Sequence, residues 1–148
     1  MFSSTRRKRS ATRLGYGTVA TLLRGVDSPG HTVLVVDDDP SIRLLCRLNL
    51  ELDGWQVREA ATLAQARDEL ADGDVDVLVL DVHVGTGNGV EFLREVRRER
   101  PRLRVAMLTG SDTLGEVDSD AVIPKPFTIE QLTGTVAVLA SRPARTAG

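Results

Sequence analysis

The chain has 148 residues, which is enough for one domain with a proper hydrophobic core. Hydrophobic residues make up 41% and charged residues 27%, as in soluble globular proteins, and no apolar run approaches the ~20 residues that a membrane-spanning helix needs. The single cysteine, Cys46, excludes an internal disulfide. We expect it to be buried and the protein to be cytoplasmic, because a lone cysteine fits a reducing compartment.

The formal net charge of −2 is unevenly distributed. Residues 1–30 carry six basic side chains and one acidic side chain, whereas residues 31–148 carry 13 basic and 20 acidic ones. The first segment lacks sustained periodicity, so we expect a basic, disordered extension, followed by a domain over 31–140 and a flexible tail over 141–148. An Arg-rich, acid-poor start also resembles a transit peptide, and the run at 6–9 would suit nucleic acid, although four clustered cations bind it weakly.

From residue 31 onward, strand-like and helix-like patterns alternate. The expected strands cover residues 32–36, 55–59, 75–80, 105–108 and 121–123. The expected helices cover residues 40–52, the stretch from the cap Thr62 to about 70, 89–100, and the stretch from the cap Thr128 to about 140. In the first helix the residues at helical spacing are Ile42, Leu45, Leu48 and Leu52. This alternation predicts an α/β fold, a doubly wound parallel sheet with helices on both faces.

Polar side chains stand at the ends of the expected strands. Three carboxylates at residues 37–39 follow the first strand. Alone, such a cluster is typical of a solvated turn with an Asp helix cap. However, Asp81 ends the third strand, Thr109 ends the fourth and Lys125 follows the fifth. Because ligands bind beyond the carboxyl ends of strands in such folds, the convergence of these side chains favours a functional site.

This set of side chains suits a cation and a phosphoryl group. Close carboxylates need a cation, and Mg²⁺ is held by one or two carboxylates with waters and phosphate oxygens. Asp37 and Asp38 are natural metal ligands. The sequence has no Cys/His cluster, which disfavours zinc. Asp81 is the natural nucleophile, which would become an aspartyl phosphate. The Thr109 hydroxyl and the Lys125 ammonium would each neutralise a phosphoryl oxygen.

Four motifs in this order resemble the receiver domain of two-component response regulators. They are VLVVDDDP at 33–40, VLVLD at 77–81, MLT at 107–109 and KPF at 125–127. Each motif is weak alone, but four at successive strand ends make a specific match over residues 32–140. The resemblance implies a flavodoxin-like, five-stranded parallel sheet with strand order 2-1-3-4-5.

The resemblance also implies the roles of the site residues. Asp81 would be the phosphoacceptor, Asp38 a direct Mg²⁺ ligand and Asp37 a ligand that acts through water. Asp81 itself and the backbone carbonyl of His83 would supply further Mg²⁺ ligands. The bond between Lys125 and Pro126 would be cis.

Several positions depart from the pattern of that family. Gly85 stands where the family usually has proline, which should loosen the loop after the acceptor. His83, two residues after the acceptor, would either tune dephosphorylation or be a solvated loop residue. Ser111, two residues after Thr109, borders the site and is more often a turn residue than a participant. Val122 replaces a common aromatic, and residues 111–120 are too few for the usual loop and helix, so we expect the fourth helix to be shortened or missing.

The leading functional hypothesis is a stand-alone receiver that is a phosphoacceptor rather than an enzyme. Its partners would be a sensor histidine kinase or phosphotransfer protein and a downstream protein, with no nucleic acid and no membrane. The alternative is a receiver-like interaction module that works without phosphorylation, which the losses at Val122 and the fourth helix favour. A metal-dependent phosphatase with an Asp-x-Asp pair is disfavoured, because His83 occupies the second Asp position.

Overall fold

The computed structural model describes residues 31–110 and 114–143. The expected basic extension over residues 1–30 and most of the expected tail lie outside the described residues. Within the described part, no helix has the length and hydropathy needed to cross a bilayer.

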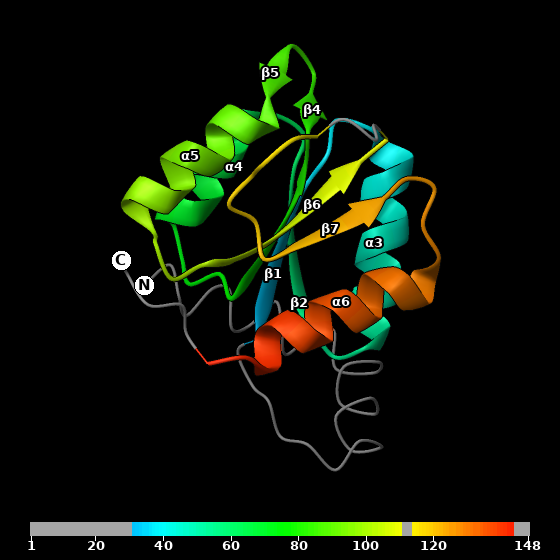
Figure 1. The fold of residues 1–148 in the computed structure, drawn as a ribbon. Helices are drawn as coiled ribbons and strands as arrows, with labels where there is room; N and C mark the ends of the chain where they lie inside the picture. Colours follow the sequence, from blue (N-terminus) through cyan, green and yellow to red (C-terminus); the bar gives the residue numbers. More distant parts are fainter. Residues whose placement is uncertain (1–30, 111–113, 144–148) are drawn as a thin grey trace.

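A five-stranded parallel sheet forms the centre of the domain (Figure 1). Its strands are β1 (Thr32–Val36), β2 (Gln56–Ala60), β3 (Val77–Asp81), β6 (Arg104–Thr109) and β7 (Ala121–Pro124). They lie in the order β2-β1-β3-β6-β7, and every neighbouring pair is parallel. Numbered along the chain, this is the order 2-1-3-4-5, so the prediction of the fold is confirmed.

Four helices of the described chain cover the two faces of the sheet. On one face lie α4 (Leu63–Ala71) and α5 (Gly89–Glu99), and on the other lie α3 (Pro40–Leu52) and α6 (Ile129–Ser141) (Figure 1). The N–H groups in the first turn of each helix have no acceptor within the helix, and side-chain oxygens accept hydrogen bonds from them instead. These caps are Asp39, Thr62, Asn88 and Thr128. Asp39 therefore serves as the helix cap, which separates it from the other two carboxylates of its run.

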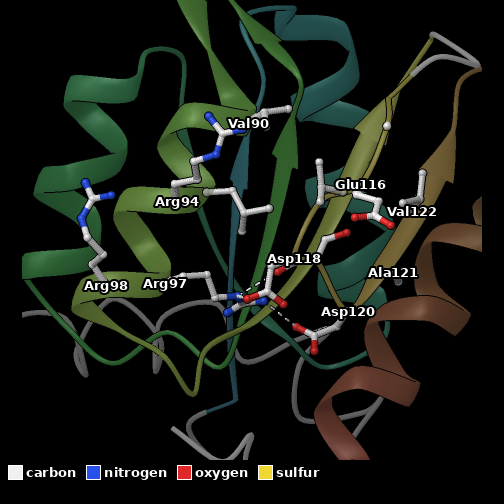
Figure 2. A pocket seen from close by; sticks show the side chains of 13 residues that line it. Val90, Arg94, Arg97, Arg98, Glu116, Asp118, Asp120, Ala121 and Val122 are labelled. Carbon is white, nitrogen blue, oxygen red and sulfur yellow. Dashed lines mark hydrogen bonds and ion pairs between the residues drawn. The ribbon is translucent and has the colours of Figure 1, made fainter. Parts of the chain in front are cut away.

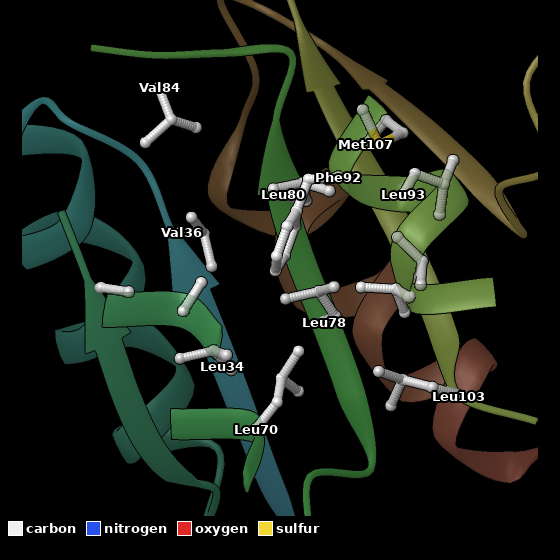
Figure 3. Packing of buried hydrophobic residues seen from close by; sticks show 14 of the residues in the cluster. Leu34, Val36, Leu70, Leu78, Leu80, Val84, Phe92, Leu93, Leu103 and Met107 are labelled. Carbon is white, nitrogen blue, oxygen red and sulfur yellow. The ribbon is translucent and has the colours of Figure 1, made fainter. Parts of the chain in front are cut away.

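Each face of the sheet has its own hydrophobic core. Figure 3 shows the core under α4 and α5, in which Phe92 and Leu93 of α5 belong to one buried cluster with Leu78 and Leu80 of β3. The cluster on the opposite face contains, from the helices, Cys46, Leu50, Leu132, Val136 and Leu139. Because β1 and β3 are buried on both faces, their sequences are continuous apolar runs. Those runs made the strands visible in the sequence.

The buried face of α3 differs from the leucine repeat in its sequence. Leu45, Leu48 and Leu52 are 37%, 49% and 57% exposed, whereas Cys46 and Leu50 are fully buried. The last two residues are four apart and so share the stripe that faces the sheet. A helix with apolar residues around much of its circumference offers two such stripes, and periodicity alone did not tell which one packs inward.

The loop after β3 forms a small antiparallel hairpin of β4 (His83–Val84) and β5 (Gly87–Asn88). Gly85, in its turn, has a φ of +61°. Proline is fixed at about −65° and cannot take this conformation, which glycine adopts readily. Glycine therefore suits this turn, and the expectation that it loosens the loop stays a prediction. Gly89 then allows close approach, because a Cβ there would lie 2.1 Å from the carbonyl oxygen of Asp81.

Between β6 and β7, the described residues 110 and 114–120 form no helix. The expected loss of the fourth helix is confirmed for this part of the chain. The short connection is held by Asp120, whose carboxylate oxygens lie 3.0 Å from Nη2 of Arg97 and 3.0 Å from Nη1 of Arg104. Asp120 also accepts the backbone N–H of Val105 at 2.8 Å. Because the Asp120 side chain is 5% exposed, this is a buried ion-pair cluster.

Candidate functional site

Three carboxylates meet at the carboxyl ends of β1 and β3. Asp37 and Asp38 directly follow β1, and Asp81 is the last residue of β3, which pairs with β1. One carboxylate oxygen of each residue lies within 4.8 Å of the others. Asp37 is fully buried, Asp81 is 8% exposed and Asp38 is exposed. The structure thus brings together the three carboxylates that the sequence singled out.

Lys125, which directly follows the edge strand β7, reaches this carboxylate cluster. Its Nζ lies 2.8 Å from Oδ2 of Asp37 and 3.2 Å from Oδ2 of Asp81, so the ammonium donates a hydrogen bond to each carboxylate. The backbone N–H of Lys125 donates to the carbonyl of Thr109 at 2.7 Å, which ties this segment to the end of β6. The peptide bond between Lys125 and Pro126 is cis, as the resemblance implied.

The charges of this cluster shift each other's protonation. Burial and, next, the charge of Asp37 raise the pKa of Asp81, although the charge and hydrogen bond of Lys125 and a backbone hydrogen bond from His83 oppose the shift. Burial by itself would lower the pKa of Lys125. The hydrogen bond and charge of Asp37, joined by those of Asp81, outweigh burial and raise the pKa of Lys125 above its ordinary value. The geometry therefore favours a charged lysine and penalises an unneutralised second carboxylate.

The donor set of the cluster fits a small hard cation. Three carboxylates face a single ammonium, so the cluster retains negative charge when all four groups are ionised. Its donors are all oxygens, which suits Mg²⁺ or Ca²⁺ and not zinc. The exposed carboxylate of Asp38 leaves the cluster open to solvent, and Mg²⁺ keeps several waters when bound to protein. The residues present therefore fit Mg²⁺ binding.

Thr109 lies at the same edge of the sheet as these charges. It is the last residue of β6, 5% exposed, and pairs in register with Pro124 of β7. His83 is exposed at the start of the hairpin, so its imidazole is accessible, and the role of its backbone carbonyl as a metal ligand stays a prediction. Ser111 lies outside the described residues.

A groove of about 1000 Å³ opens beside the edge strand β7 (Figure 2). Val90 and Leu93 of α5 line one wall, with Arg94 and Arg98 further along the same helix. Val122, where the family commonly has an aromatic, lines the other wall and is 48% exposed. Within residues 31–110 and 114–143, no helix of the short connection between β6 and β7 covers Val122 of β7.

Comparison with known proteins identifies the family. A model of the response regulator receiver domain matches residues 33–137. The chain belongs to the response regulator receiver family. The response regulator MprA of Mycobacterium avium is 34% identical over 116 residues, which cover 74% of this chain and 51% of that protein. The chain therefore spans about half the length of the curated relatives it matches.

Solved receivers have the same fold. The chemotaxis response regulator CheY4 of Vibrio cholerae superposes with a TM-score of 0.68 at 28% identity, over 74% of this chain and 98% of that chain. The response regulator TrrA of Thermotoga maritima superposes with a TM-score of 0.68 at 26% identity, over 74% of this chain and 98% of that chain. The latter structure is a complex with Mg²⁺ and BeF. Both likenesses agree with the fold of this receiver.

Arg43 is a residue of the site that the sequence did not predict. Its Nη1 donates a hydrogen bond to the backbone carbonyl of Asp37 at 2.7 Å. The sequence contains only a weak signal for this contact, an arginine one turn into the helix that follows the acidic run. Arginine side chains are mostly exposed in proteins, and this bond requires α3 to be packed against the end of β1.

Proposed function

We propose that this receiver accepts a phosphoryl group on Asp81 from the phosphohistidine of a sensor histidine kinase or phosphotransfer protein, in the cytoplasm. The observation that carries the proposal is the Lys125 ammonium, which bridges Asp81 and Asp37 within a cluster of three carboxylates. An ordinary surface turn does not bury a carboxylate completely beside a second carboxylate and a lysine. Such an arrangement suits a dianionic phosphoryl group, which needs positive charge on several oxygens.

In the proposed reaction a carboxylate oxygen of Asp81 attacks phosphorus. A new P–O bond forms, the P–N bond to the donor's imidazole breaks, and its electron pair returns to the ring nitrogen. The Lys125 ammonium would shift from Asp81 to a phosphoryl oxygen, and the Thr109 hydroxyl would donate to another. Mg²⁺, held by Asp37, Asp38, Asp81 and the carbonyl of His83, would neutralise phosphoryl charge.

The receiver would promote both its own phosphorylation and its own dephosphorylation. The phosphorylated state would change its interactions with a downstream protein. Attack of water on phosphorus breaks the P–O bond to Asp81, releases inorganic phosphate and restores the carboxylate. The backbone N–H of His83 donates a hydrogen bond to the Asp81 carboxylate, and the imidazole of His83 is exposed to solvent. We therefore propose His83 as a residue that sets the lifetime of the phosphorylated state.

The proposal is tested by incubation of the full chain with acetyl phosphate and Mg²⁺, followed by intact mass measurement. We expect one added phosphoryl group, lost in Asp81→Asn. Asp74→Asn is the matched control, because Asp74 is an exposed aspartate before the amino end of the same strand. An unmodified wild-type chain would favour the alternative, a receiver-like module that binds its partner without phosphorylation.

The exposed leucines of α3 suggest where the phosphodonor protein docks. Leu44, Leu45, Leu48 and Leu52 are between 37% and 57% exposed. At 100° per residue they share one face of α3, whose first turn directly follows the acidic run. A donor that brings its phosphohistidine to Asp81 must place neighbouring surface on this end of the domain. We propose that an apolar helix face of the phosphodonor protein packs on these leucines.

This docking surface can be separated from the chemistry by the choice of phosphodonor. Leu48→Glu should slow phosphorylation by a phosphorylated histidine phosphotransfer protein at least tenfold, because a buried charge replaces an apolar contact. Phosphorylation by acetyl phosphate should be unchanged. Val138→Glu is the matched control, since Val138 is an equally exposed apolar residue on α6. Equal slowing by both variants, or slowing with acetyl phosphate, would contradict the assignment of this face.

A further inference from the structure

The guanidinium of Arg43 holds the backbone beside the acidic cluster. Its Nη1 lies 2.7 Å from the carbonyl oxygen of Asp37, and its Nε lies 3.3 Å from Oε1 of Glu59 on β2. The side chains of Arg43 and Glu59 are 19% and 27% exposed, so both interactions are partly sheltered from water. Hydrogen bonds from a charged donor are stronger and shorter than those between neutral groups. Arg43 therefore links α3 and β2 to the end of β1.

Every backbone and carboxylate group of Asp37 has a hydrogen-bond partner, and Arg43 supplies the partner of the backbone carbonyl. The N–H of Asp37 donates to the carbonyl of Ala60 at 3.1 Å. Its Oδ1 accepts the N–H of Asp39 at 2.9 Å, and its Oδ2 accepts the Lys125 ammonium at 2.8 Å. With the bond from Arg43, each of its backbone and carboxylate groups is fixed by a different neighbour. This is a preorganised residue at the centre of the cluster.

Asp38 depends on the same backbone more strongly than Asp37 does. The carbonyl of Asp37 and the nitrogen of Asp38 belong to one planar peptide unit, so fixing the carbonyl fixes the plane from which Asp38 extends. The Asp38 side chain is exposed, and no hydrogen bond or ion pair joins its carboxylate to another residue of the described ranges 31–110 and 114–143. The backbone is therefore the fixed part of the structure from which the Asp38 carboxylate extends toward the other two.

We propose that Arg43 is a positioning residue for the cation site, and that Glu59 directs its guanidinium. This inference rests on the proposed function, in which Asp37 and Asp38 bind Mg²⁺. Arg43 acts through the peptide between these two residues and not as a ligand. Ligands that are already oriented lose less conformational freedom on binding, and removal of an orienting partner typically weakens metal binding about 10–100-fold.

Arg47 offers a matched control on the same helix. Its Nη1 lies 3.0 Å from Oε2 of Glu59, the other oxygen of the carboxylate that binds Arg43. The contacts of Arg47 in the described chain do not include Asp37. Arg43→Met and Arg47→Met thus each remove one positive charge and one ion pair of Glu59. Only Arg43→Met releases the Asp37 carbonyl.

The experiment is a calorimetric titration of the full chain with Mg²⁺ alone, for wild type, Arg43→Met, Arg47→Met and Arg43→Lys. We expect Arg43→Met to weaken Mg²⁺ binding about tenfold or more, and Arg47→Met to change it less than about twofold. Arg43→Lys should lie between wild type and Arg43→Met, because an ammonium can donate to the carbonyl but does not reproduce the guanidinium fork. Urea unfolding of each variant checks that it is folded.

The sign of the effect distinguishes positioning from bulk charge. Removal of a positive charge near an anionic site removes a Coulomb repulsion and so strengthens the binding of another cation. Weaker binding in Arg43→Met is therefore not explained by its lost charge. Equal Mg²⁺ affinity in Arg43→Met and Arg47→Met would overturn the inference. If Arg43→Met does not fold, an Mg²⁺ affinity of Arg43→Lys equal to that of the wild type would overturn it. If the wild type itself binds no Mg²⁺, the cation site of the proposed function fails.

Discussion

The ion-pair cluster at Asp120 predicts a large difference between two neighbouring aspartates. Asp120→Ala removes a carboxylate that is 5% exposed and binds Arg97 and Arg104, whose side chains are 10% and 15% exposed. It also leaves the N–H of Val105 without its acceptor. Removal of one member of a buried ion pair costs about 3–5 kcal/mol, because its partner stays buried and uncompensated. Both arginines reach some solvent, so we expect the lower end, about 3 kcal/mol.

The matched control is Asp118→Ala. The Asp118 side chain is 64% exposed and lies 3.5 Å from Nε of Arg97. Arg97 also donates to the backbone carbonyl of Asp118, and that bond survives the substitution. An exposed ion pair contributes about 0–1 kcal/mol, so the free energy of unfolding should change by no more than this amount.

Urea unfolding followed by the fluorescence of Trp55, the only tryptophan, measures both variants. With a urea dependence of about 2 kcal/mol per molar, a loss of 3 kcal/mol lowers the midpoint by about 1.5 M. Asp120→Asn serves if the alanine variant does not fold, because its amide oxygen still accepts from Val105, and we expect about half the loss. Equal losses in Asp118→Ala and Asp120→Ala would refute the reasoning that this cluster holds the short connection.

Three further predictions concern the thiol of Cys46 and two glycines, Gly89 and Gly134. Burial raises the pKa of the Cys46 thiol to about 12, so iodoacetamide at mildly alkaline pH should leave Cys46 unmodified until urea unfolds the chain, and rapid labelling of the folded chain would contradict its burial. Gly89→Ala places a Cβ 2.1 Å from the carbonyl oxygen of Asp81, and should lower the free energy of unfolding by about 3 kcal/mol. Gly134→Ala in α6 meets no atom within 4 Å and should instead raise it by about 0.5–1 kcal/mol in the same urea assay.

The sheet and its helices could be predicted because their signals are local. The strands β1 and β3 are continuous apolar runs, and the caps Asp39, Thr62 and Thr128 stand where the sequence placed helix starts. Once the elements alternate, the parallel sheet and the shared edge of its strand ends follow from chain topology. The convergence of the carboxylates and Lys125 could therefore be inferred before any coordinates.

Other features depend on contacts between distant segments. Packing against β1 and β2 decides which stripe of α3 faces the sheet. The spacing of leucines along α3 did not predict that stripe. The contact of Arg43 with the Asp37 carbonyl and the Arg97–Asp120 pair join residues whose spacing carries no helical or strand period. The two-residue strands of the hairpin after Asp81 are too short to produce an alternating pattern.

In the proposed reaction Asp81, and neither Asp37 nor Asp38, receives the phosphoryl group. Borohydride reduces an aspartyl phosphate to homoserine, which marks the modified residue permanently. After treatment with acetyl phosphate, Mg²⁺ and borohydride, we expect homoserine at residue 81 alone in peptide mass spectra. Homoserine at residue 37 or 38, or a chain that contains none, would contradict it.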